Sequence, residues 1–181
     1  MTEFLAYKEV DEAQYAALEG ATTAEEVKAL LVDTMGVSYP DERKQRIACD
    51  LYFYCYAFCK EHAFDGKKTT TFLSMMKQVF QRDTEGDFGT NRTLSNSYEW
   101  YEEVLMRHCV ERAPSSVQVF EDHEVGPILD FAVDTYFRQY RMYRYIFGVQ
   151  ARVKIQMLLP QSVEIPASTF LPLTSGVMKG E

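Results

Sequence analysis

The sequence predicts a mainly α-helical protein, a compact bundle of about five to six helices with a short extended or β-like segment near the C-terminus. Apolar residues recur every three or four positions through most of the chain, which is the spacing of amphipathic helices. Residues that start and stop helices flank these stretches. The 181 residues suit one domain, which we assign to 1–159, followed by an extended tail with prolines at 160–181.

The first two predicted helices lie at 21–36 and 39–66. In the first, Thr23 precedes Glu26 by three residues, the spacing of a capping box, and Gly36 provides the stop. The second is apolar over much of its circumference, so we expect it at the centre of the core or between the core and a partner. Its stripe at helical spacing comprises Ile47, Leu51, Tyr54, Cys55, Phe58, Cys59 and His62.

Three further helices are predicted at 68–83, 93–113 and 122–147. We expect the last to be one continuous helix, with Pro127 tolerated in its first turns. After it, residues 151–158 read ARVKIQML and alternate apolar with polar side chains. That alternation is typical of a strand or of an extended segment that pairs with a partner.

The charge of the chain is acidic overall and uneven along its length. The formal net charge of −8 argues against a general nucleic-acid binder, which needs a basic surface. Residues 1–35 hold eight acids and two lysines, a net −6, whereas residues 135–156 hold five basic residues and no acid, a net +5. The two regions either contact each other or a partner, or form two solvated faces.

Membrane and secretion signals are not apparent. No apolar run reaches the ~18 residues of a membrane span, and the start MTEFLAYKEV does not have the pattern of a signal peptide. The four cysteines are therefore expected to be reduced thiols, in the cytosol or a compartment continuous with it.

Two possible metal sites were considered. The segment 83–91, DTEGDFGTN, resembles a calcium loop, but in that register Phe88 takes the glycine position and Leu94 the acidic one. A zinc site is conceivable from Cys55, Cys59 and His62, with a fourth ligand from the pair at 108–109, yet these positions lie on apolar faces where cysteine packs as a small hydrophobe.

No catalytic motif is present: we find no nucleophile elbow, phosphate-binding loop, dinucleotide glycine pattern or zinc-protease motif. We therefore expect a non-enzymatic protein that needs no cofactor and no metal. The competing hypothesis is an unrecognised enzyme, metal-dependent through the cysteine and histidine residues of the second predicted helix.

Residues 134–147, DTYFRQYRMYRYIF, form the most unusual segment. On a continuous helix, one narrow sector, assigned to the core, holds Leu129, Val133, Tyr136, Tyr140, Tyr143 and Phe147. Three arginines spread over the opposite half, beside two aromatic rings, a composition typical of interface hot spots. The predicted partner-binding residues, with two from the following segment, are Phe131, Arg138, Arg141, Arg144, Tyr145, Arg152 and Lys154. A calmodulin-type target helix is the alternative.

The chain resembles a known family over roughly residues 40–158. The resemblance is carried by DLYFYCYAFCKEHAF, by KTTTFLSMMKQVF, and by SSVQVFEDHEVGPILDFAVDTYFRQYRMYRYIF with the basic segment after it. The most specific piece is VDTYFRQYRMYRYIF with the preceding VQVF. These residues resemble the coiled-coil domain-containing protein 189 family, also called cilia- and flagella-associated protein 119.

The resemblance implies a structural or adaptor subunit of the axoneme in motile cilia or flagella. It implies a place in a central-pair projection, with a large scaffold of the sperm-associated antigen 17 type and calmodulin among its components; a radial-spoke association is the other placement. Association with microtubules would then be indirect, and neither nucleic acid nor membrane is expected as a partner. Although the family name refers to a coiled coil, the sequence shows no sustained heptads and hence no coiled coil.

Overall fold

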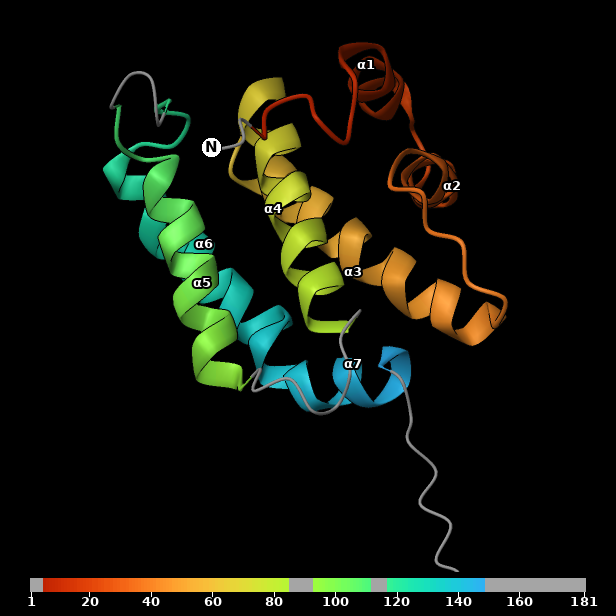
Figure 1. The fold of residues 1–181 in the computed structure, drawn as a ribbon. Coiled ribbons are helices and arrows are strands. Elements are labelled where there is room, and N and C mark those ends of the chain that lie inside the picture. Colours follow the sequence, from red (N-terminus) through yellow and green to blue (C-terminus); the bar gives the residue numbers. More distant parts are fainter. Residues whose placement is uncertain (1–4, 85–92, 112–116, 149–181) are drawn as a thin grey trace, which may run out of the picture. The chain divides into compact units, whose positions relative to one another are not determined.

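The computed structural model describes residues 5–84, 93–111 and 117–148, and all regular structure in these ranges is helical (Figure 1). The prediction of a mainly α-helical bundle is confirmed. The predicted β-like segment and the tail lie outside the described residues. The helices are α1 (Glu12–Gly20), α2 (Ala24–Thr34), α3 (Glu42–Glu61), α4 (Gly66–Thr84), α5 (Leu94–Arg107), α6 (Asp122–Thr135), the 3₁₀ turn η1 (Phe137–Gln139) and α7 (Tyr140–Phe147).

Short polar side chains cap the N-termini of several helices. Thr23 accepts a hydrogen bond from the backbone N–H of Glu26 at 3.3 Å, and the Glu26 side chain reaches back to the N–H of Thr23. This confirms the predicted capping box. Asp41 and Thr93 cap α3 and α5 by accepting from the backbone N–H groups of Arg43 and Asn96. Each cap satisfies a backbone donor that the first turn of a helix leaves without an intrahelical partner.

The boundary between α3 and α4 differs from the prediction. The second predicted helix was expected to run to Gly66, but α3 ends at Glu61 and Gly66 is the first residue of α4. Ala63 takes a positive φ of 53°, and Phe64 N–H donates to the Cys59 carbonyl at 2.9 Å. This is a Schellman motif with alanine in the left-handed position that glycine usually occupies. Because the prediction relied on the nearest glycine, it placed the end of the helix too late.

Helix α4 occupies the centre of the bundle, where it packs against α1, α3, α5 and α7 (Figure 1). Its residues Phe72, Met75 and Phe80 are fully buried. The same apolar cluster includes residues from each of the seven α-helices in the described ranges. Burial of these side chains is the main source of stability, since each large apolar group contributes about 1.5–3 kcal/mol on leaving water.

The predicted helix at 122–147 is broken. Helix α6 ends at Thr135, η1 follows, and α7 begins at Tyr140. Because a 3₁₀ turn has 3.0 residues per turn instead of 3.6, the two helices do not share one continuous stripe. Val133, predicted to be in the core, is 41% exposed, and Ala132 is buried in its place.

Helix α1 was not predicted, and neither was its contribution to the core. Only Tyr15 and Leu18 of its nine residues are buried, too few for a clear periodic signal. The segment before it adds Leu5 and Val10 to the core. None of the described helices combines the length and hydropathy needed to cross a membrane.

Candidate protein-interaction surface

The predicted arginine face lies on η1 and α7. Arg138 and Arg141 are exposed, and Tyr145 is 66% exposed. Arg144 is half-buried, with its guanidinium 5.8 Å from the centre of the Tyr140 ring. The structure therefore brings four of the predicted residues onto one short stretch of the surface, with Arg144 turned toward the core.

The other three predicted residues are placed differently. Phe131 was expected beside the arginines, but it is half-buried and stacks on Phe58 with ring centroids 4.4 Å apart. Its ring faces inward because Phe131 lies beside Ile128 and Ala132, the residues that α6 buries. Arg152 and Lys154 lie outside the described residues.

A groove separates α7 from α3. It has a volume of about 250 Å³ and is lined by Ile47, Asp50, Leu51, Tyr54, Thr135, Gln139, Met142 and Tyr143. Tyr54 is 58% exposed and Met142 39% exposed. The sequence placed Tyr54 on the core stripe of the second predicted helix, and the structure corrects this: its ring stands at the surface, along the groove.

The positive charge beside the groove is not neutralised by the described residues. Neither Arg138 nor Arg141 has an ion pair with any part of the chain that the structure describes. Asp50 in the groove pairs with Lys28 at 2.9 Å. Asp134 precedes Arg138 by four residues, the spacing of a helical ion pair, but the helix ends between them and no such pair forms within the described ranges.

The acidic N-terminal region pairs with other helices. Glu9 contacts Lys77 of α4 at 2.5 Å, and Glu19 contacts Lys60 of α3 at 3.1 Å. Part of the negative charge at the N-terminus is thus used within the bundle, and the structure shows no ion pair from these two acids to α7.

A buried carboxylate fixes the corner between α6 and α7. Asp83, at the end of α4, is 2% exposed. Its Oδ2 accepts hydrogen bonds from the Tyr136 hydroxyl at 2.8 Å and from the Ser97 hydroxyl at 2.5 Å. Tyr136 is the C-cap residue that follows α6. One side chain therefore joins α4, α5 and the start of η1.

Burial raises the pKa of Asp83, although its two hydroxyl donors and the nearby Arg82 and Arg144 guanidiniums act in the opposite direction. Burial also raises the pKa of Tyr136 well above its ordinary value, and the adjacent Asp83 adds to the shift. The hydroxyl of Tyr136 thus stays a donor at neutral pH, and the corner is held by a neutral phenol and a carboxyl group.

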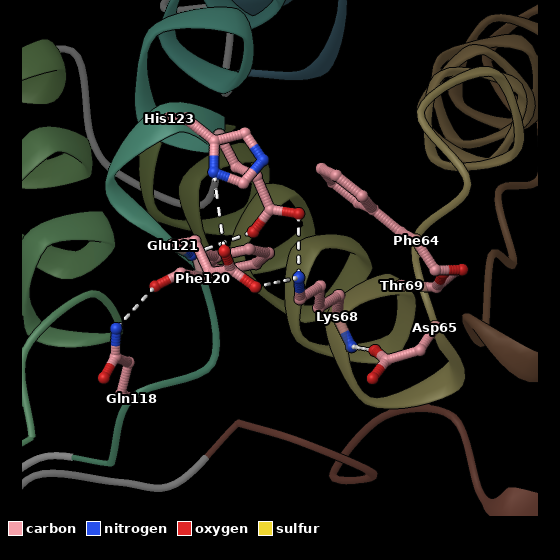
Figure 2. A network of polar contacts seen from close by, with 9 residues as sticks. Phe64, Asp65, Lys68, Thr69, Gln118, Phe120, Glu121 and His123 are labelled. Carbon is pink, nitrogen blue, oxygen red and sulfur yellow. Dashed lines mark hydrogen bonds and ion pairs between the residues drawn. The ribbon is translucent and has the colours of Figure 1, made fainter.

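A second polar network ties the start of α4 to the start of α6 (Figure 2). Lys68 Nζ lies 2.8 Å from Glu124 and 3.7 Å from Glu121, and Asp65 accepts from the Lys68 backbone N–H at 2.7 Å. His123 lies at the exposed edge, 3.5 Å from Glu121. All of these groups are paired or solvated, and the network has a structural role: it holds the start of α4 against the start of α6.

The cysteine and histidine residues considered for zinc do not converge. Cys55 and Cys59 are fully buried, and burial raises the pKa of both thiols. His62 is exposed and packs its ring 4.3 Å from that of Phe58. Among the described residues, no group of three or more histidine, cysteine or acidic side chains could hold a metal ion.

The fold and this surface define a class: a small helical protein with a basic, aromatic face beside a groove. A comparison with protein families gives a more particular assignment. The family model CLAMP, described as flagellar C1a complex subunit C1a-32, matches residues 54–155. The match covers more than half of the chain, and the chain belongs to this family. It is accordingly an axonemal protein of the central apparatus in cilia or flagella.

Proposed function

We propose that the chain is a non-enzymatic structural adaptor within the C1a projection of the central pair and contributes to its assembly and to ciliary motility. Membership of a C1a subunit family supports the location. The observation that supports the adaptor role is the pair of exposed arginines, Arg138 and Arg141, without ion partners among the described residues. Arginine is enriched at interface hot spots, where it can pair with carboxylates bidentately.

Finer assignments belong to the same proposal. We propose that the chain is related to the coiled-coil domain-containing protein 189 type of protein. Its partner would be a large scaffold of the sperm-associated antigen 17 type, and its association with microtubules would be indirect. A radial-spoke association is the alternative placement. The finer assignment draws on the sequence resemblance between residues 40 and 158, and the family match at 54–155 overlaps most of it.

A calmodulin-binding regulatory module is the alternative function. Calmodulin takes amphipathic helices by their apolar face. In α7 that face is occupied: Tyr140 and Tyr143 are buried, and Phe147 packs 4.9 Å from Phe80 and 5.0 Å from Tyr39. Calmodulin binding would require α7 to leave the core, so the folded chain favours the adaptor function.

The adaptor function is tested by reversing the two exposed charges. The variant Arg138→Glu/Arg141→Glu should fold normally, because both side chains are solvated, and should lose at least tenfold in co-sedimentation with axonemes that lack their own copy. Arg144 is left unchanged, since a glutamate there would face Tyr140 and lie near the buried Asp83.

The matched control is Arg43→Glu/Lys44→Glu, which makes the same charge change in the first turn of α3, at two positions that do not line the groove and form no ion pair with the described residues. It should co-sediment like the wild type. Unchanged co-sedimentation of the Arg138/Arg141 variant, with its thermal unfolding also unchanged, would remove the support for docking through this face.

A further inference from the structure

The groove between α3 and α7 has a size and a lining suited to binding the side chains of another protein. Its volume of about 250 Å³ lies below the roughly 300–1,000 Å³ of typical small-molecule pockets. Two large apolar side chains, Tyr54 and Met142, stand exposed on its opposite walls. An exposed tyrosine and methionine facing one groove are typical of a surface that a second protein covers.

The spacing along α3 matches a helical occupant. Ile47, Leu51 and Tyr54 lie at i, i+4 and i+7, so they form one strip along the helix. The α7 wall runs alongside with Gln139, Met142 and Tyr143. Two helices that flank an apolar strip can accommodate the apolar face of a third, which is the helix-in-groove mode of recognition.

The charge at the rim selects an acidic occupant. In α7, Arg141 and Tyr145 are one turn apart on the outward face, and Met142 lies between that face and the groove. Arg138 precedes them on η1, and Asp50 inside the groove is already paired with Lys28. On a chain of net charge −8, these two arginines, which form no ion pair with the described residues, are a local exception that complements carboxylates.

We infer that the groove between α3 and α7 binds an acidic amphipathic helix of another axonemal protein. Apolar side chains of that helix seat between Tyr54 and Met142, and its carboxylates pair with Arg138 and Arg141. The inference rests on the proposed adaptor function for the existence of a partner, and adds which groove holds it and what chemistry it presents.

The test is photo-crosslinking with the full chain, carrying benzoylphenylalanine in place of Tyr54, in isolated axonemes that lack their own copy. The expected product is a peptide of a different protein, rich in Asp and Glu and with apolar residues at helical spacing. Met142→Ala should lower the crosslink yield about tenfold, as for the loss of an interface anchor. Met106→Ala, at a similarly exposed methionine of α5, is the matched control and should leave the yield unchanged.

Other products overturn the inference: a second copy of the chain, residues 152–181 of the chain itself, a basic peptide, or no protein. A crosslink that is insensitive to Met142→Ala also overturns it. Incorporation of the wild-type chain is measured in the same samples. If the chain incorporates into axonemes but the crosslink fails, the groove is not the binding site and the adaptor function stands. If the chain does not incorporate, the adaptor function itself fails.

Discussion

Asp83 is the residue whose ionisation bears most directly on the fold. Burial raises its pKa from the ordinary value of 3.8, so the folded state holds the proton to higher pH than the unfolded state does. In that interval the folded protein binds more protons, and the free energy of unfolding falls as the pH rises. The carboxylate then persists because Ser97 and Tyr136 donate to it.

The variant Asp83→Asn removes this titration and keeps an oxygen that can accept from both hydroxyls. We expect the stability of the wild type relative to Asp83→Asn to decrease as the pH rises above the ordinary carboxyl pKa of 3.8, measured by urea unfolding. Asp130→Asn, the same substitution at an exposed position of α6, is the control for the loss of one charge. An advantage of the wild type that grows with pH would show that the hydroxyl donors outweigh burial.

At the level of helices, the contact between α1 and α4 depends on Gly66. A Cβ added at this position would lie 2.9 Å from Cε1 of Tyr15 and 3.0 Å from the hydroxyl oxygen of Tyr7. Tyr15 is buried, and Tyr7 is held by its backbone N–H, which donates to Thr70 at 3.3 Å. The Tyr15 ring cannot move without disturbing the packing of α1, whereas the Tyr7 side chain is 37% exposed and can move aside. The glycine therefore permits the close packing of the two helices chiefly through the contact with Tyr15.

Gly66→Ala should therefore lower the free energy of unfolding by about 1–3 kcal/mol, the usual effect of overpacking. Gly126→Ala in α6 is the matched control, because an added Cβ there meets no atom within 4 Å. It should raise stability by up to about 1 kcal/mol through helix propensity. Urea unfolding of both variants tests the pair; equal stability of Gly66→Ala and the wild type would mean that Tyr15 moves aside easily.

Helix positions were predictable where apolar spacing and end signals agreed. The Thr23–Glu26 capping box with Gly36 defined α2, and the helix predicted at 68–83 agrees closely with α4. The prediction was less accurate where tertiary contacts decide. Nothing in the local sequence indicates the break after Thr135, where the Tyr136 hydroxyl donates to Asp83, 53 residues away in the sequence.

The candidate surface was also predictable only in part, because local patterns identify some of its residues and tertiary contacts decide the others. The arginine and tyrosine pattern of η1 and α7 pointed to Arg138, Arg141 and Tyr145, which the structure exposes. It misplaced Phe131, whose direction depends on the register of α6. It could not indicate the groove, since Tyr54 comes from a helix about 90 residues earlier and its exposure depends on how α3 packs.

At the scale of the whole molecule, the folded unit is larger than the segment that the family model matches. The match begins at Tyr54, in the middle of α3, whereas the core also includes residues from the N-terminal part of the chain. These residues are Leu5, Val10, Tyr15, Leu18, Val27, Leu31, Met35 and Val37. The Tyr56 hydroxyl also donates to the Leu18 carbonyl at 3.0 Å, deep in the bundle.

A chain of residues 38–181 should therefore lose cooperative unfolding even though it keeps α3 to α7 entire. Removing the first 37 residues exposes apolar surface on α3 and α4 and leaves Lys60 and Lys77 without Glu19 and Glu9. We expect retained far-ultraviolet circular dichroism, a weakened near-ultraviolet signal and strong binding of an apolar dye, the signature of helices without fixed packing. A sharp two-state urea transition like that of the full chain would show instead that α3 to α7 fold by themselves and that α1 and α2 are an added layer.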